Sequence, residues 1–255
     1  METDSVLLER RDGVGVITLN DPNRRNALTL PSSARLAELV AECEADETIS
    51  AVVVTGAPPA FCAGADLTAL GEAHEQGLRA IYAGFLAVAH CALPTIAAVG
   101  GAAVGAGLNL ALACDVRLVG PRARFDARFL QLGLHPGGGM TWMLQRIVGP
   151  QTAMAMTVLG QTADAATAER TGLALRTVDG DHDALVTAAV NLAAPAVAAP
   201  RELVLATKRT LRTTSTLTEH AAAVETELVA QLTSMAGPAF TELLAAMREK
   251  ISRST

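Results

Sequence analysis

Two short segments of small residues have the composition needed to bind a negatively charged oxygen. Phe61 to Leu67 (FCAGADL) follows Ala51 to Thr55, an apolar run that predicts a buried strand. Gly100 to Leu108 (GGAAVGAGL) follows a second run of this kind, Thr95 to Val99. Because glycine and alanine let the backbone approach a ligand closely, each turn can aim main-chain N–H groups at one point. Two such donors form an oxyanion hole, which stabilises an oxygen atom as it becomes negatively charged during a reaction. Each segment taken alone is explained equally well as an ordinary tight turn.

The elements that must hold these segments follow an α/β pattern. Val6 to Arg10 and Gly15 to Leu19 flank Asp12-Gly13 and predict a β-hairpin. Strands are expected at 51–55, 95–99 and 116–119, and helices at 30–45, 75–92 and 106–113. The recurring order of strand and helix indicates an α/β core with mainly parallel strands.

The chain from Gly137 onward is expected to be helical. Helices are predicted at 164–171, 183–194, 201–210, 218–234 and 238–252. Pro195 and Pro200 are expected to separate the helices at 183–194 and 201–210, with a hinge at 193–200, and Thr218 is a candidate N-cap. We therefore divide the chain into a core, residues 1–195, and a C-terminal helical region, residues 196–255.

The composition and charge of the chain exclude several classes of protein and of partner. Half of the 255 residues are hydrophobic, which allows one sizeable core. A net charge of −6 and a pI near 5.4, with no basic stripe, argue against a nucleic-acid partner. The sequence has no apolar run of about 18 residues that would span a membrane, and its first residues lack a signal-peptide pattern. Cys43, Cys62, Cys91 and Cys114 lack metal-site spacing and are expected to be buried, reduced thiols of a cytoplasmic protein without a metal.

Taken in order, the two segments and four further motifs resemble the enoyl-CoA hydratase/isomerase (crotonase) family. The further motifs are Leu19 to Leu28 (LNDPNRRNAL), Gly133 to Gly139 (GLHPGGG), Ala199 to Lys208 and Phe240 to Lys250. The resemblance runs nearly from end to end. It implies a crotonase-like spiral of β-β-α units with a C-terminal helical region, assembled as a homotrimer or a hexamer. The C-terminal helices would pack on the core or on a neighbouring subunit.

The resemblance also implies an acyl-CoA thioester as substrate, with coenzyme A as part of it and no tightly bound cofactor. The N–H groups of Ala65 and Ala106 match the two donors of the family's oxyanion hole. Ala106 stands where the family has the middle glycine of a G-G-G run, and an alanine keeps the N–H. The residues expected to bind CoA are Arg24, Arg25, Ala27, Ala63, Asp66, Leu67, Met247 and Lys250.

Some of these residues have simpler explanations. Arg24 and Arg25 could be a solvated surface pair, and Asp66 could cap a helix beginning near residue 67. Lys250 could be an exposed helix end, where its charge favours the negative end of the helix dipole. Trp142, the only tryptophan, could pack in the core or line the acyl pocket.

The sequence departs from the family where standard hydratases carry their two catalytic glutamates. Those positions are Asn109 and Phe129, and neither side chain can take up a proton. We therefore do not expect the standard two-glutamate mechanism. His135, next to the Pro136 turn, and Asp126 are the candidate replacements. A structural role explains either one equally simply, with His135 bonding a loop carbonyl and Asp126 lying at the surface or capping.

The resemblance implies an enzyme that stabilises a thioester enolate, a hydratase/isomerase-like lyase or isomerase of fatty acid metabolism. Isomerisation, atypical hydration, thioester hydrolysis and decarboxylation all need the same oxyanion hole, so the residues do not choose among them. The alternative is a catalytically inactive acyl-CoA-binding protein on the same fold. A nucleotide-binding α/β protein is a weaker alternative, because Gly137-Gly138-Gly139 lacks the Lys and Ser/Thr of a P-loop.

Overall fold

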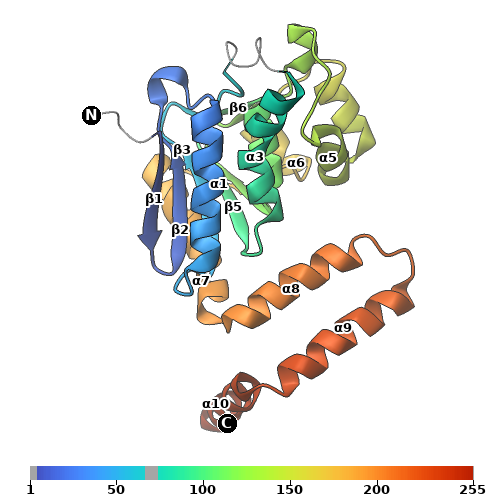
Figure 1. The fold of residues 1–255 in the computed structure, drawn as a ribbon. Helices are drawn as coiled ribbons and strands as arrows, with labels where there is room; N and C mark the ends of the chain where they lie inside the picture. The colour runs from blue at the N-terminus through green and yellow to red at the C-terminus, as the bar shows by residue number, and fades with distance from the viewer. Residues whose placement is uncertain (1–4, 67–73, 255) are drawn as a thin grey trace. The chain divides into compact units, whose positions relative to one another are not determined.

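The computed structural model describes residues 5–66 and 74–254. The chain divides into two compact units, residues 1–197 and residues 198–255. The first unit carries every strand of the described chain, and the second is helical (Figure 1). The α/β fold class predicted from the sequence is confirmed.

A six-stranded sheet forms the centre of the first unit (Figure 1). Its strand order is β1-β2-β3-β5-β7-β10, with bounds Val6–Arg11, Val14–Leu19, Ala51–Gly56, Thr95–Val99, Val116–Val119 and Arg176–Thr177. β1 and β2 form the predicted antiparallel hairpin, and every other neighbouring pair is parallel. Strands β3 and β5 are buried along their whole length, as expected of a parallel sheet covered on both faces.

A second sheet has four strands, and three of them follow directly in the chain after strands of the first sheet. It has the order β4-β6-β8-β9, formed by Ala60–Cys62, Ala102–Val104, Arg124–Asp126 and Ala163–Asp164. The chain passes from β3 to β4, from β5 to β6 and from β7 to β8, so each repeat gives one strand to each sheet. This alternation is the expected spiral of β-β-α units. The strands of the second sheet are too short for periodicity in the sequence to predict them.

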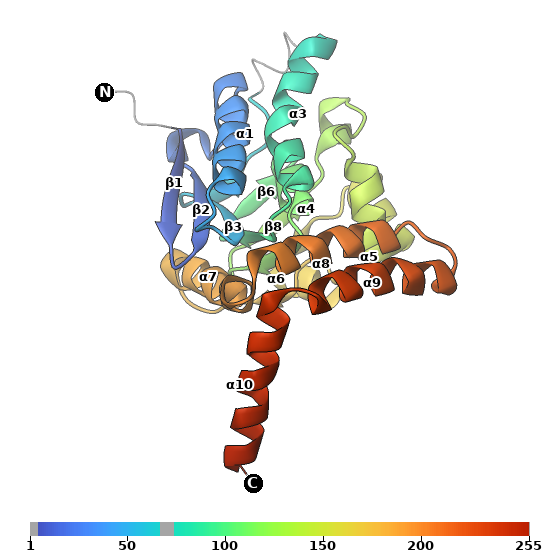
Figure 2. The same ribbon diagram turned by 60° about the horizontal axis from the view of Figure 1, so that its bottom comes forward.

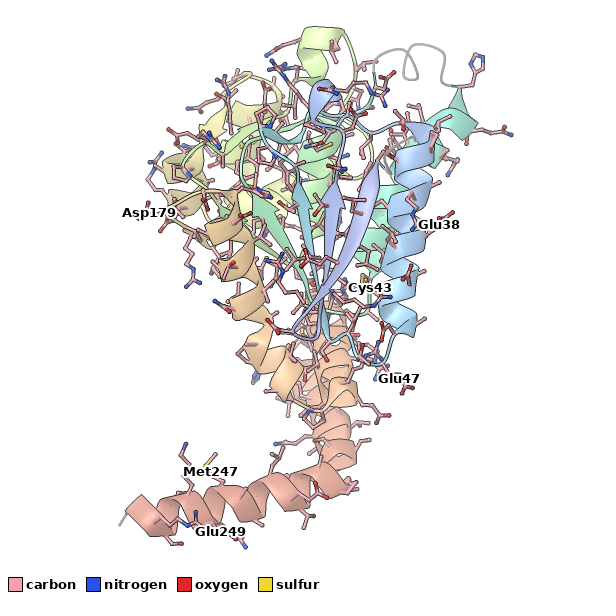
Figure 3. The ribbon with its side chains drawn as sticks, turned by 90° about the vertical axis from the view of Figure 1, so that its left-hand side faces the viewer. Glu38, Cys43, Glu47, Asp179, Met247 and Glu249 are labelled. Carbon is pink, nitrogen blue, oxygen red and sulfur yellow. The ribbon has the colours of Figure 1, made fainter. Side chains whose placement is uncertain are left out.

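Helices cover both faces of the six-stranded sheet. On one face lie α1 (Leu30–Ala45) and α3 (Glu75–His90), which pack against each other (Figure 1). Cys43 of α1 is buried beside the sheet (Figure 3), and the lack of a side chain at Gly15 of β2 leaves room for its sulfur. The other face is covered by α7 (His182–Ala198), whose Leu185, Ala189 and Ala193 pack on alternate residues of β2, β3 and β5.

Helix α4 (Ala106–Ala113) lies in the interior and connects the two sheets. All eight of its residues are buried, which fits a helix that is apolar all round. Its C-terminal end is held by Arg117, whose guanidinium donates to the carbonyls of Ala111 at 3.3 Å, Cys114 at 2.6 Å and Leu173 at 2.6 Å. Burial lowers the pKa of Arg117, and the carbonyl dipoles compensate for its buried charge.

The remaining elements of the first unit are η1 (Pro22–Arg24), η2 (Phe129–Leu132), α5 (Met140–Thr157) and α6 (Ala165–Arg170). α5 is interrupted at Gly149-Pro150, where Gly149 has a φ of 77°. β9 and β10 lie in the part of the chain that was expected to be helical, so that expectation is wrong for these two-residue strands. Each of them adds to the edge of an existing sheet.

The second unit consists of α8 (Arg201–Thr214), α9 (His220–Met235) and α10 (Pro238–Ser254). α9 has no buried residue. Two expectations for the C-terminal region are wrong: Pro195 lies inside α7 rather than ending a helix, and the N-cap of α9 is Glu219 rather than Thr218. No single described helix has the length and apolar composition of a membrane span, although α7 and α8 taken together pass that test as a bent pair.

Candidate functional site

The two segments predicted to carry the oxyanion hole lie side by side. Gly107 of α4 lies so close to the backbone of Cys62 that a Cβ on it would collide with the Cys62 carbonyl oxygen. Gly64, with a φ of 104°, also approaches the turn before α4: a Cβ there would lie 2.8 Å from the Val104 oxygen and 3.7 Å from the Ala106 nitrogen. The glycines therefore bring the segment of Ala65 next to the first residue of α4.

The N–H of Ala65 is left unused by its neighbouring chain segment. Ala65 forms a parallel bridge with Leu28, in which the Leu28 N–H donates to the Gly64 oxygen at 2.7 Å and the Asp66 N–H donates to the Leu28 oxygen at 2.8 Å. In such a bridge the N–H of the middle residue points to the opposite side. The Ala65 N–H therefore points away from residue 28.

The N–H of Ala106 is unused for a different reason. Ala106 is the first residue of α4, and the earliest hydrogen bond of that helix runs from the Asn109 N–H to the Gly105 oxygen at 3.0 Å. The first N–H groups of a helix have no partner inside it. Gly105 caps the helix without any side-chain hydrogen bond. A free donor at the positive end of α4 thus lies beside the Ala65 segment.

Asn109 and Phe129, at the positions of the family's glutamates, both border this helix end. The Asn109 carboxamide is buried, and its Nδ2 donates to the Gly137 oxygen at 2.8 Å. The tip of the Phe129 ring, atom Cζ, would lie 4.0 Å from a Cβ on Gly105. The site thus has an amide and an apolar ring at these positions.

The two candidate acid/base residues differ in their surroundings. His135 is exposed, and its Nδ1 lies 2.7 Å from the Pro136 oxygen. Because a carbonyl only accepts, Nδ1 carries the proton in this bond and Nε2 is the accepting nitrogen of the neutral ring. The Asp126 side chain is buried, and its Oδ2 accepts from Arg128 Nη2 at 2.6 Å and Nε at 3.1 Å. Asp126 is therefore held in an ion pair rather than presented alone.

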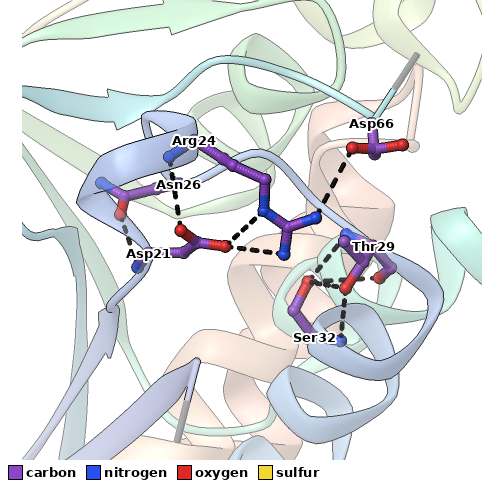
Figure 4. A network of polar contacts seen from close by, with 6 residues as sticks. All are labelled: Asp21, Arg24, Asn26, Thr29, Ser32 and Asp66. Carbon is purple, nitrogen blue, oxygen red and sulfur yellow. Dashed lines mark hydrogen bonds and ion pairs between the residues drawn. The ribbon is translucent and has the colours of Figure 1, made fainter. Parts of the chain in front are cut away.

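The loop before α1 contains the first group of expected CoA-binding residues. Arg24 pairs with Asp21 at 2.7 Å and with Asp66 at 3.7 Å (Figure 4). This network joins residues 21–24 to the segment of Ala65. The Arg25 side chain is exposed, and its backbone is left-handed with a φ of 52°.

The main-chain groups of Ala27 and Ala63 are partly used by the protein itself. The Ala27 N–H donates to the Arg24 oxygen at 3.1 Å, and the Ala63 N–H donates to the Arg25 oxygen at 3.0 Å. Contacts from these two residues to a ligand must therefore come from their carbonyl oxygens. Leu67, the last residue of this group, lies outside the described residues, as does the helix that Asp66 was expected to cap.

Met247 and Lys250 lie on α10, in the second unit, and Met247 is 56% exposed (Figure 3). Trp142, at 57% exposure, is not a core residue, so that alternative is wrong. Its ring lies under the guanidinium of Arg146, 4.0 Å from the ring centroid.

Asn26 and Tyr82 are contributors to this region that the sequence did not single out. Asn26 is buried with a φ of 58°, and its Nδ2 donates to the oxygens of Ala57 and Ala60, both at 2.8 Å. Asparagine tolerates the left-handed region, which is the signal that could have marked it. Tyr82 of α3 places its hydroxyl against Gly137, and its being the only tyrosine was the available signal.

The comparison with known proteins establishes the class of this chain. The sequence model described as Enoyl-CoA hydratase/isomerase matches residues 9–250. The chain therefore belongs to the enoyl-CoA hydratase/isomerase family.

Individual relatives cover almost the whole chain. It is 54% identical to "Probable enoyl-CoA hydratase EchA14" of Mycobacterium tuberculosis strain H37Rv over 97% of this chain and 98% of that protein. Among solved structures, it is similar to an enoyl-CoA hydratase of Mycobacterium smegmatis, with a TM-score of 0.88, 30% identity and 97% of each chain covered. It is also similar to a Thermobifida fusca YX chain titled "a putative enoyl-CoA hydratase" in complex with CoA, with a TM-score of 0.82, 31% identity, and 91% of this chain and 93% of that chain covered.

Proposed function

We propose that this chain is an enzyme that acts on acyl-CoA thioesters by stabilising a thioester enolate. The observation that carries the proposal is the juxtaposition of two main-chain donors, the N–H groups of Ala65 and Ala106, at the N-terminal end of α4. Both would donate to the thioester oxygen as it becomes negative, and the dipole of α4 would add to their effect. The CoA in the structure of the Thermobifida fusca relative supports the choice of ligand.

Coenzyme A would be held by the loop before α1 and by the Ala65 segment. The carbonyl oxygens of Ala27 and Ala63 can accept hydrogen bonds from an adenine amino group, which offers only donors there. Arg24 and Arg25 would meet phosphates, and Asp21 and Asp66 keep the Arg24 side chain near the Ala65 segment. Asp66, Leu67, Met247 and Lys250 complete the set that we assign to CoA binding, and no tightly bound cofactor is required.

Proton transfer is assigned to His135 or Asp126, and His135 is the better candidate. Its Nε2 is an accepting nitrogen at the exposed edge of the turn that contains Gly137. Asp126 is already paired with Arg128, which holds its Oδ2 in two hydrogen bonds, so that oxygen is occupied. Replacing His135 with Ala should therefore lower turnover more than replacing Asp126 with Asn.

The first test is turnover of crotonyl-CoA, followed as loss of the conjugated enoyl absorbance, with binding measured in the same sample. Loss of absorbance would show that hydration proceeds without the two glutamates. Tight binding without turnover of any acyl-CoA would favour the inactive acyl-CoA-binding alternative. Absence of binding to every CoA ester would contradict the proposal.

The oxyanion hole can be tested by removing one donor without removing a side chain. Ala106→Pro deletes the N–H at the first helical position, where proline is tolerated. Turnover should fall by about 100- to 1000-fold, as it does when one donor of an oxyanion hole is lost. Ala165→Pro is the matched control, because Ala165 is the first residue of α6 and also follows a non-helical cap residue. Equal losses in the two variants would argue against a role for the Ala106 N–H.

A further inference from the structure

A hollow in the first unit lies where three turns of the chain meet the beginning of α7. Each turn leads from a strand of the six-stranded sheet into one of the four-stranded sheet: β3 to β4, β5 to β6 and β7 to β8. α7 covers the face of the large sheet opposite α1 and α3 (Figure 2). The hollow encloses about 330 Å³, counted to its open mouth. Open α/β sheets commonly bind ligands at the carboxyl ends of their parallel strands, which is where this hollow lies.

The hollow is separate from the candidate oxyanion hole. β4 begins beside it at Ala60 and ends at Cys62, before the segment of Ala65, and β6 likewise lies between the hollow and α4. Three residues of strand span about 10 Å. The two places are therefore at opposite ends of the same short strands.

Glycines at the ends of the strands keep the hollow open. A Cβ on Gly100 would lie 3.3 Å from Nδ1 of His182, and a Cβ on Gly120 would lie 3.6 Å from Cδ2 of Leu185. Larger side chains at these two positions would fill the space between the turns and α7. The sequence therefore leaves room at this point rather than closing it by packing.

Two nitrogen-bearing side chains line the hollow. Arg122, in the turn after β7, is exposed, and His182, the first residue of α7, is partly buried. Among the residues that the structure describes, neither side chain has a hydrogen bond or an ion pair. Burial lowers the pKa of His182, so its imidazole is neutral at pH 7 and can donate one hydrogen bond. Arg122 contributes a permanent positive charge and several N–H donors.

Asp181 is the acidic side chain among the lining residues, and it already has a role. Its Oδ1 accepts from the Ala184 N–H at 2.9 Å, which caps α7. Asp183 does not line the hollow, and its charge acts on Arg11 of the hairpin. The helix end is thus satisfied by its own cap, and the Arg122 guanidinium is the charged group left for a ligand.

We propose that this hollow binds a monocarboxylate with a short apolar chain, such as butanoate. The Arg122 guanidinium would donate two parallel hydrogen bonds to the carboxylate, and the His182 imidazole would donate a third. The apolar chain would lie against the remaining wall, which includes Pro58, Pro59, Pro121 and Leu185. An inorganic anion would use the positive charge but leave this apolar wall uncovered, so a carboxylate with a chain fits better. The inference does not depend on the proposed function.

The test is a titration of the natural chain with butanoate at constant ionic strength, followed by saturation-transfer NMR on the ligand. We expect saturable binding, and binding about tenfold or more weaker in Arg122→Gln, because a charged hydrogen-bond donor is lost. Arg176→Gln is the matched control, since Arg176 is also exposed but does not line the hollow. This control should bind butanoate as the natural chain does. Butanamide, which has nearly the same shape and no charge, should bind at least about tenfold more weakly than butanoate.

The competing explanation is that butanoate enters the acyl-CoA site, and butanoyl-CoA separates the two. Butanoate in the hollow should stay bound when excess butanoyl-CoA is added, whereas displacement would overturn the inference. Absence of saturable binding, or equal affinity in the natural chain and Arg122→Gln, would overturn it too. Sulfate binding as tightly as butanoate, with the same dependence on Arg122, would contradict the role of the apolar wall. If butanoyl-CoA itself does not bind, only the proposed function fails, and the two arginine variants decide this inference.

Discussion

Gly107 at the start of α4 lies directly against the backbone of Cys62 at the end of β4, and no side chain fits between them. A Cβ on Gly107 would lie 2.8 Å from both the carbonyl carbon and the Cβ of Cys62, and closer still to its oxygen. These are backbone atoms or atoms bonded to the backbone, so no side-chain rotation can relieve the contact. The approach of the two candidate donor segments depends on this glycine.

Gly107→Ala should lower the free energy of unfolding by about 1 to 3 kcal/mol or more, because overpacking must displace α4 or β4. Urea unfolding followed by circular dichroism measures the change. Gly120→Ala is the matched control, since a Cβ there has its nearest neighbours at ordinary contact distances of 3.6 Å and beyond. If both variants unfold at the same urea concentration, a side chain at Gly107 is tolerated and the expected overpacking is contradicted.

Asn26→Asp should destabilise the loop that joins β2 to α1. The change replaces Nδ2, which donates to the Ala57 and Ala60 oxygens, with an oxygen that repels them. We expect a loss of about 2 to 4 kcal/mol in unfolding free energy, since buried acceptors lose their donor. Asn191→Asp on the exposed side of α7 is the control for the added charge. A loss at Asn26 no larger than that control would contradict the expectation.

The buried thiols should make the chain lose stability in alkali. Burial raises the pKa of Cys62 to about 12, above its ordinary value near 9. Above pH 9 the unfolded chain therefore releases a proton that the folded chain retains, and folding weakens as pH rises. The slope is about 1.4 kcal/mol per pH unit for one thiol.

Cys62→Ala should reduce this alkaline loss. Measured between pH 9 and pH 10.5, the loss of unfolding free energy in the natural chain should exceed that of the variant by up to about 2 kcal/mol. Between pH 6 and pH 8 the unfolding free energies of the natural chain and of the variant should change with pH in the same way, because the Cys62 thiol is protonated in both the folded and the unfolded chain. Parallel curves throughout would show that Cys62 does not titrate in this way.

The second unit is expected to hold a homotrimer or hexamer together. α9 exposes the apolar residues Val224, Leu228, Val229, Leu232 and Met235. Leu232→Asp should therefore lower the mass measured by light scattering from a multiple of 26.3 kDa toward a single chain. Thr233→Asp is the matched control, because Thr233 is also exposed and the variant places the same charge at the neighbouring position on another face of α9. A mass unchanged by Leu232→Asp would exclude this face from assembly.

Long periodic elements were predictable from sequence, and short or locally specified ones were not. The helix at 106–113 and the strands at 95–99 and 116–119 have the predicted bounds, because apolar residues fill most of each segment. β9 and β10, two residues each, depend on neighbouring strands and carry no period of their own. Pro195 lies within α7, because the buried residues Val190 and Ala193 in the turns just before it pack on the sheet.

The candidate site was predictable in its position but not in its polar details. The order of the small-residue segments predicted the neighbourhood of Ala65 and Ala106. The pairing of Asp126 with Arg128, and the direction of the buried Asn109 carboxamide, depend on side-chain conformations that spacing does not specify. The roles of these residues stay predictions.

Both candidate donors are main-chain groups of alanine residues, and this affects how loss of function would appear in mutants. An alanine scan passes over Ala65 and Ala106 entirely, and most side-chain replacements would leave the two N–H groups in place. Loss of function would instead come from substitutions at neighbouring glycines such as Gly64 and Gly107, where the lack of a side chain allows the close approach of the backbone. A mutational map of this chain would therefore show its most sensitive positions around the reacting atoms rather than at them.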